Sequence, residues 1–394
     1  MRHRNYRLFW FGQLVSLVGT WMQSIAQSWL VLDLTKSAFK LGLTSALGML
    51  PVLFLSLPAG AIADRVDKRK LLIATQTGMM VLAFVLAALA ALHVVQPWHI
   101  YILAALLGVC NAFDMPGRQS FVIEMVGRDD LLNAVALNST AFNTARILGP
   151  AIAGLLLGTI GAAGCFFLNG VSFLAVIAGL ALMNVKPPAR SFSPNSILED
   201  MLAGLRYIGR NREILTIISI VGVFSVFGMP YAVLMPVFAK TVLHAGPGGY
   251  SILMSCTGIG AVIGAAALAT FSDIRRRGRL VLASSIIFVV AIVLFATSRS
   301  LVWSSVLLVV VGFSMVNQAA MANTMLQILA PDDLRGRVMA VFGTMFLGLA
   351  PFGSLQAGLV AEKLGAPSAL IIGSAAMAIT IASVLIFRPE LREL

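Results

Sequence analysis

The chain has 394 residues, of which 59% are hydrophobic and only 11% are charged, and its mean hydropathy is +0.94. An ordinary soluble domain carries about 25% charged residues, so this composition excludes a cytosolic globular enzyme, a disordered protein and a disulfide-rich secreted domain. The formal net charge of +12 comes from basic residues in short segments between apolar runs. We therefore interpret it as a determinant of membrane orientation and not as a nucleic-acid-binding surface.

The apolar runs are continuous and about 20 residues long, the length of a membrane-spanning helix. The strands of an outer-membrane barrel would instead show alternating segments of about 10 residues. The basic start resembles a signal peptide, but the first apolar run is too long for one. We predict an all-α membrane protein with twelve transmembrane helices, over residues 8–32, 38–63, 71–95, 98–115, 134–160, 162–185, 214–242, 250–271, 280–296, 301–329, 338–364 and 368–387.

The largest polar segment divides these helices into two sets of six. We predict an N-terminal six-helix bundle over 1–185, a cytosolic linker over 186–213 and a C-terminal six-helix bundle over 214–394. In the linker, Ser196 and Glu199 have the spacing of a capping box. Apolar residues then recur at helical spacing, which predicts an amphipathic helix lying on the membrane surface. A docking site for another protein is the alternative.

Basic residues concentrate in alternate connecting segments. They cluster at the N-terminus, over 65–70, in the linker and over 275–279, whereas the segments between these contain few of them. Lysine and arginine are enriched in cytoplasmic loops. The sequence therefore predicts a multi-pass protein of the cell inner (plasma) membrane with both termini in the cytosol.

The first predicted helix carries polar side chains spaced three and four residues apart, so that they share one face of the helix. They are Gln13, Ser16, Thr20, Gln23 and Gln27. Because amide side chains are costly in lipid, we expect this face to line a water-filled cavity. Hydrogen bonding between helices is the alternative.

A charged motif of the first half recurs in a weaker form in the second half. The first copy has the pattern Gly60-x-x-x-Asp64-Arg65-x-x-Lys68-Arg69-Lys70, and the second copy places Asp273 before a cluster of arginines. Pro150 of the fifth predicted helix likewise has a counterpart in Pro351 of the eleventh. Two halves of similar pattern are the sequence trace of a duplicated transporter.

The first copy of this motif resembles the loop signature between helices 2 and 3 of the major facilitator superfamily. The helix number, the half-repeat and the central polar segment fit that superfamily along the whole chain. Three further stretches resemble its drug and siderophore exporter branch, which includes the enterobactin exporter and macrolide efflux proteins. They are Gly12-Gln13-x5-Gly19-x-Trp21-Met22-Gln23, Leu132-Asn133-Ala134-x-Ala136-Leu137-Asn138 and Arg146-Ile147-Leu148-Gly149-Pro150. The resemblance implies the major facilitator fold of two pseudo-symmetric six-helix bundles.

The resemblance also implies a conformational gate. Its residues would be Gly60, Asp64, Arg65, Gly149, Pro150 and Asp273. In the superfamily the loop motif latches the two halves together, and the alternative is that its charges only fix membrane topology. Gly149 and Pro150 resemble the antiporter motif, in a helix that proline allows to bend. For these two residues the alternative is close packing of small side chains.

In the superfamily, helices 1, 4, 7 and 10 surround a central cavity. The cavity candidates in this sequence are Gln13, Thr20, Gln23, Gln27, Asn111, Arg146, Tyr231, Asn317 and Gln318. Amide and aromatic side chains with little charge suit bulky amphipathic organic molecules.

Few ionisable residues lie in the predicted spans, and each of them is a functional hypothesis. Asp33, at the outer end of the first helix, would carry a proton if it were desolvated, and pairing with Lys36 is the alternative. Asp114 is the second proton-coupling candidate, and its alternative role is to join the basic residues of the loop between helices 2 and 3. Arg146 lies near mid-membrane, where its charge would attract an anionic substrate.

We predict a secondary active transporter that exports small amphipathic organic molecules, such as drugs or siderophores, by proton-coupled alternating access. The alternatives are an importer, a facilitator or a lysophospholipid flippase on the same fold, and a non-transporting membrane sensor or scaffold. We expect a monomeric chain whose partners are a small-molecule substrate and the lipid bilayer, driven by a proton gradient and without a cofactor. The sequence has no phosphate-binding loop, no hydrolase motif and no metal-spaced cluster, so we expect no nucleotide, no metal and no enzymatic activity.

Overall fold

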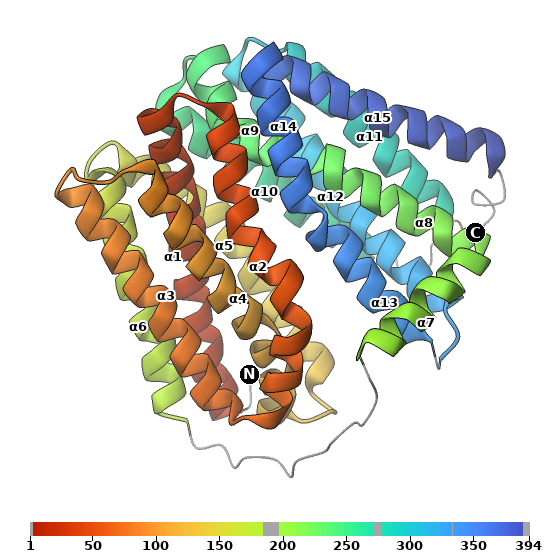
Figure 1. Ribbon diagram of the computed structural model, residues 1–394, viewed down its shortest axis with the longest axis horizontal. Helices are drawn as coiled ribbons and strands as arrows, with labels where there is room; N and C mark the ends of the chain where they lie inside the picture. The colour runs from red at the N-terminus through yellow and green to blue at the C-terminus, as the bar shows by residue number, and fades with distance from the viewer. Residues whose placement is uncertain (1–2, 184–196, 271–276, 333, 389–394) are drawn as a thin grey trace. The chain divides into compact units, whose positions relative to one another are not determined.

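The computed structural model describes residues 3–183, 197–270, 277–332 and 334–388, without the side chains of Leu57, Asp64 and residues 197–203 (Figure 1). Within these ranges the secondary structure is helical, with no strand. The chain forms two compact units. Unit 1 comprises Met1–Lys36, Leu47–Phe192 and Gly246–Ser255, and unit 2 comprises Ser37–Ala46, Ser193–Ala245 and Cys256–Leu394.

Unit 1 is built from the first six helices. They are α1 (Arg4–Thr35), most of α2 (Ala38–Arg65), α3 (Lys68–Ala91), α4 (Pro97–Val126), α5 (Leu131–Leu157) and α6 (Gly161–Ala181). Helix α1 packs against α5 and α6, and α3 packs against α4 and α6 (Figure 1). These contacts bury one face of α1 and one face of α6, where buried polar side chains such as Gln23 and Asn169 find partners.

Helices α1 and α6 approach each other at the level of their backbones. A Cβ atom on Gly12 would lie 2.9 Å from the carbonyl oxygen of Ala175, and one on Gly179 would lie 3.0 Å from that of Leu8. Small residues allow such close contact between membrane helices, where apolar burial alone gives little driving force. Nearby, the ring of Phe9 packs edge-on against Phe121 of α4, with 6.3 Å between the ring centroids.

Unit 2 is built from the remaining helices. They are α7 (Ile197–Arg210), α8 (Arg212–Val223), η1 (Phe224–Gly228), α9 (Tyr231–Val237), η2 (Phe238–Val242), most of α10 (Gly246–Thr270), α11 (Arg277–Thr297), α12 (Leu301–Leu329), α13 (Arg335–Gly343), η3 (Thr344–Gly348), α14 (Ala350–Leu364) and α15 (Ala366–Phe387). Helix α11 packs against α12 and α15, α14 packs against α15, and α13 packs against α7 (Figure 1).

Two long helical stretches of unit 2 contain π-helical turns close to prolines. The turn η1 ends just before Pro230, and η3 ends just before Pro351. Proline has no N–H to continue the α-helical hydrogen-bond ladder, and a π-helical turn is one way for a helix to absorb the interruption. The sequence predicted single helices over 214–242 and 338–364, and the structure divides each of them at these turns.

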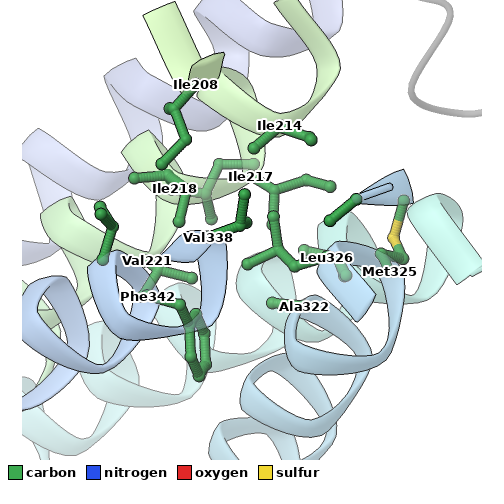
Figure 2. Close-up of a cluster of buried hydrophobic side chains, with 14 of the residues drawn as sticks. Ile208, Ile214, Ile217, Ile218, Val221, Ala322, Met325, Leu326, Val338 and Phe342 are labelled. Atoms are coloured by element: carbon green, nitrogen blue, oxygen red, sulfur yellow. The ribbon is translucent and has the colours of Figure 1, made fainter. Parts of the chain in front are cut away.

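The core of unit 2 joins α7, α8, α11, α12, α13 and α15 around side chains that are mostly aliphatic (Figure 2). Its labelled members are Ile208 of α7, Ile214, Ile217, Ile218 and Val221 of α8, Ala322, Met325 and Leu326 of α12, and Val338 and Phe342 of α13. Ile208 is only 3% exposed. The described end of α7 therefore packs on the protein core, where the sequence predicted an amphipathic helix lying on the membrane, and the exposed Arg206 and Arg210 occupy its other face.

Eleven helical segments of the described chain are long and apolar enough to cross a membrane, judged by length and composition. Helix α1 has 32 residues and is not among them. The amide and hydroxyl side chains of α1 lower its mean hydropathy. Helix α1 nevertheless packs against α6, which is one of the eleven segments. The chain is therefore a helical multi-pass membrane protein, and the number of twelve spans stays a prediction.

The crossing of α10 and α12 yields a first testable prediction. A Cβ atom on Gly312 would overlap the carbonyl oxygen of Thr257 and would lie 3.0 Å from the backbone nitrogen of Ala261. Because backbone atoms cannot rotate away, Gly312→Ala is expected to destabilise the protein by about 1–3 kcal/mol. The measurement is the thermal unfolding midpoint of the purified protein in detergent.

Gly336→Ala is the matched control, because no described atom lies within 4 Å of the Cβ position at this helical glycine. The control is expected to keep or slightly raise the unfolding midpoint, since alanine has the higher helix propensity. Equal midpoints for the two variants would contradict the close crossing of α10 and α12.

Candidate functional site

The side chain of Asp114 lies in the interior of unit 1. It is 1% exposed, and its Oδ1 atom accepts hydrogen bonds from Thr75 Oγ1 at 3.0 Å and from Gln76 Nε2 at 2.8 Å. Its Oδ2 atom lies 2.8 Å from Nη2 of Arg118, one turn further along α4. This contact lacks hydrogen-bond geometry, so the attraction is Coulombic. A buried carboxylate persists in the charged form only with partners of this kind.

Arg118 extends this cluster to a third helix. Its Nη1 atom donates to Oε1 of Gln13 in α1 at 2.9 Å. We call the five residues Gln13, Thr75, Gln76, Asp114 and Arg118 the Asp114 network. It connects α1, α3 and α4 within unit 1.

Three buried atoms of the Asp114 network have no hydrogen-bond partner in the described chain. They are Nε2 of Gln13, Oε1 of Gln76 and Oδ2 of Asp114, and of these only the last has an ion-pair partner, Arg118. Because buried polar atoms are ordinarily paired, the network has a spare donor and a spare acceptor. It therefore has the polar atoms needed to bind a water molecule.

The sequence suggested that Asp114 would join the basic residues of the loop between α2 and α3. The structure gives it a cation from its own helix, Arg118, and two of the loop cations have other partners. Lys68 forms an ion pair with Glu124. Arg69 donates to the carbonyl oxygens of Leu180 and Ala181, both at 2.6 Å, at the end of α6.

The polar face of α1 divides into two kinds of residue. Gln13 and Gln23 are buried, and Gln23 Oε1 accepts a hydrogen bond from Asn169 Nδ2 of α6 at 2.7 Å. These two amides form the interhelical hydrogen bonds that were the alternative to a cavity lining. Thr20 is exposed, with its hydroxyl donating to the carbonyl oxygen of Ser16, and Gln27 is half-buried.

The unit 2 candidates lie on α9 and α12. Tyr231 is 2% exposed, its hydroxyl donates to Sδ of Met315 at 3.8 Å, and its ring packs against Phe288. Asn317 donates to the carbonyl oxygen of Phe313 in its own helix at 2.8 Å. Gln318 is 1% exposed, and neither polar atom of its side chain has a partner among the described residues. Leaving a buried amide without a hydrogen bond costs about 1–3 kcal/mol of folding free energy. Gln318 is therefore a candidate to bind a polar group of a ligand.

The other charged candidates are less enclosed. Asp33 is exposed near the end of α1, close to Lys36, which ends the helix in a left-handed conformation with φ of 51°. Asn111 and Arg146 are both half-buried. The structure thus gives Asp33 and Asp114 opposite environments, one open and one enclosed.

The gate candidates fall partly outside the described residues, which exclude the side chain of Asp64 and all of Asp273. Arg65 is exposed, and a Cβ atom on Gly60 would meet no described atom within 4 Å. By contrast, a Cβ atom on Gly149 would overlap Trp21 and would lie 2.9 Å from the carbonyl oxygen of Val18. Gly149 and the buried Pro150 therefore lie in a close contact between α5 and α1.

Sequence reasoning missed four residues that build these networks. Arg118 lies beyond the end of the predicted span over 98–115. Thr75, Gln76 and Asn169 are polar residues inside predicted spans, and their polarity there was the available signal. Their partners were not available, because spacing along one helix says nothing about which neighbouring helix it faces.

Apolar helices of spanning length and a buried charged network define a multi-pass membrane protein. The sequence profile of the transmembrane secretion effector family matches residues 1–394. The chain therefore belongs to this family of the major facilitator superfamily, and it is a transporter and not an enzyme. The resemblance to the drug and siderophore exporter branch is confirmed.

Three comparisons illustrate the similarity. The multidrug efflux pump Tap of Mycolicibacterium fortuitum is 28% identical over 396 residues, covering 98% of this chain and 96% of that protein. The staphyloferrin A transporter of Staphylococcus aureus is 26% identical, covering 91% and 90% of the two chains. The crystal structure of the nucleoside transporter NupG superposes with a TM-score of 0.78 at 12% identity, covering 98% of this chain and all of that one. At this identity the last likeness concerns the fold alone.

The Asp114 network yields a second prediction. Arg118→Gln leaves a buried carboxylate without its counter-charge, which is expected to destabilise the protein by on the order of 3 kcal/mol. The double variant Asp114→Asn/Arg118→Gln removes both charges and is expected to unfold at a higher temperature than Arg118→Gln alone. Thermal unfolding of the four proteins of this double-mutant cycle in detergent gives the coupling energy. Strictly additive effects would contradict the ion pair.

Proposed function

We propose that the chain exports small amphipathic organic molecules by proton-coupled alternating access. The observation that carries this is the similarity to a multidrug efflux pump, which covers 98% of this chain and 96% of that protein. The similarity to a siderophore transporter supports the same class of organic cargo. The chain would work as a monomer in the cell inner membrane, with both termini in the cytosol according to its loop charges.

The side chains of unit 2 support a weakly charged amphipathic substrate. Met315 and Gln318 are three residues apart on α12 and so share one face of that helix. Met315 contacts the hydroxyl of Tyr231, and Gln318 lacks a partner within the described chain. An aromatic ring, a soft thioether and an unpaired amide would hold an apolar body with one polar substituent.

Asp114 is the residue that we assign to proton coupling. In the described structure Arg118 balances its charge. If substrate binding or a helix movement withdrew the guanidinium, the buried carboxylate would be left uncompensated and would take up a proton. Half a turn of the Gln76 amide would then present its unpaired Oε1 to the new O–H group. Return of Arg118 would release the proton.

The first test concerns export. Cells that lack the chain are loaded with a panel of fluorescent dyes, macrolides and siderophores, and intracellular accumulation is compared with that in cells expressing the chain. Expression is expected to lower the steady-state level of at least one amphipathic compound. Faster uptake would contradict export and favour an importer. Transfer of lysophospholipid alone would favour a flippase, and an unchanged panel would contradict transport of this substrate class.

The second test concerns coupling. Purified protein is reconstituted in vesicles, and substrate flux is driven by an imposed pH gradient. Asp114→Asn is expected to lose gradient-driven flux to the level of empty vesicles and to keep substrate counterflow, because the variant still binds but carries no proton. Asp33→Asn is the matched control, since the exposed Asp33 loses the same charge.

Undiminished gradient-driven flux in Asp114→Asn would contradict the assignment to this residue. Loss of gradient-driven flux in Asp33→Asn, together with normal flux in Asp114→Asn, would assign proton coupling to Asp33 at the end of α1. Counterflow serves as the reference in both variants, because it shows that the reconstituted protein is folded and binds substrate.

A further inference from the structure

A groove of about 620 Å³ follows the crossing of α1 and α6 on the surface of unit 1. Its floor is formed where Gly12 and Gly179 bring the two backbones together, so no large side chain fills it. Its walls are apolar and open to the surroundings, with Phe11 57% exposed, Val15 50% exposed and Leu182 62% exposed. The volume lies in the range of small-molecule sites, about 300–1,000 Å³.

Two arginines stand at one end of this groove. Arg4 and Arg7 line it, both are exposed, and they lie three residues apart on the same face of α1. Among the described residues, no carboxylate pairs with either guanidinium. The groove is thus amphipathic along its length, cationic at the start of α1 and apolar beyond.

The position of these arginines is unfavourable for the helix itself. The N-terminus of a helix carries partial positive charge, so cations in the first turn are repelled and anions are attracted. The first turn of α1 has no acidic residue, and the described carboxylate at this helix end, Asp130, lies 2.7 Å from Nε2 of the N-cap residue His3 and pairs with neither arginine. An anion held between Arg4 and Arg7 would offset both their mutual repulsion and their repulsion from the helix dipole.

We infer that this groove binds an anionic glycerophospholipid of the adjoining membrane leaflet. The phosphate would sit between Arg4 and Arg7, and one acyl chain would lie along Phe11 and Val15 of α1 and Ala178 of α6. Helix α6 is one of the segments long and apolar enough to span a membrane, and its Ala175 and Ala178 are exposed in the groove. Basic pockets between membrane helices recognise anionic lipid headgroups in this way. A free phosphate would leave the apolar walls unused.

Native mass spectrometry of the delipidated full-length protein tests this inference. Phosphatidylglycerol and phosphatidylcholine with the same acyl chains are titrated in, and the apparent affinity of each bound lipid is measured. Wild-type protein is expected to prefer phosphatidylglycerol. Arg4→Ala/Arg7→Ala is expected to weaken phosphatidylglycerol binding roughly 25-fold, about fivefold for each basic residue, and to leave phosphatidylcholine unchanged.

Two matched controls separate the groove from general effects. Arg206→Ala/Arg210→Ala removes the same charge from exposed positions of α7 and is expected to keep phosphatidylglycerol affinity. Ala178→Trp fills the groove and is expected to weaken both lipids, whereas Ala378→Trp, on the exposed face of α15, is expected to weaken neither. The unfolding midpoint of each variant shows that the fold is retained.

Four outcomes would overturn the inference. Unchanged phosphatidylglycerol affinity in Arg4→Ala/Arg7→Ala would show that the two arginines do not bind the headgroup. An equal loss of phosphatidylglycerol affinity in Arg206→Ala/Arg210→Ala would show that the effect depends only on the net charge of the protein. Competition by inorganic phosphate, together with full lipid binding by Ala178→Trp, would assign the arginines to a soluble anion. A dimer that is independent of lipid and is lost in Ala178→Trp would assign the groove to a second copy of the chain.

Discussion

The organisation of unit 1 depends on the cost of placing charges and amides inside apolar helices. Asp114 lies in the interior of unit 1, and Arg118 lies within ion-pair distance of its carboxylate. Because an uncompensated buried charge is strongly destabilising, α4 must keep a position in which Thr75 and Gln76 of α3 reach the carboxylate. Gln13 of α1 must in turn reach the guanidinium. One ion pair therefore fixes the relative positions of three helices, which apolar contacts alone would leave free to slide.

The helices were predictable to the extent that hydropathy determines them. The apolar run over 98–115 predicted the membrane part of α4, yet the helix continues to Val126. Hydropathy ends where Arg118 and Glu124 appear, but the helix continues because those charges find partners in Gln13 and Lys68. The prolines at 230 and 351 were visible in the sequence. The π-helical turns beside them were not, because the hydrogen-bond register around a proline depends on its packing.

The candidate site was predictable by residue type and not by pairing. Three- and four-residue spacing correctly grouped Gln13 and Gln23 on one face of α1, but both are engaged by residues more than a hundred positions away, Arg118 and Asn169. In a helical membrane protein the sequence of a helix shows which of its faces is polar. Which neighbouring helix forms hydrogen bonds with that face depends on the packing of the whole unit. The sequence placed Asp33 before Asp114 as a proton-coupling candidate for the same reason, because it did not show that Asp33 is exposed and Asp114 is buried.

The same packing indicates where unit 1 is free to move. Helices α1 and α6 meet through the backbones at Gly12 and Gly179, so they are expected to move together. Helix α4 differs, because Pro116 lies between Asp114 and Arg118 and removes an N–H from the helical ladder. A bend at this proline changes the distance between the carboxylate and the guanidinium directly. On the proposed mechanism, protonation of Asp114 and bending of α4 are therefore two descriptions of one event: breaking the ion pair frees the helix, and straightening the helix restores the pair.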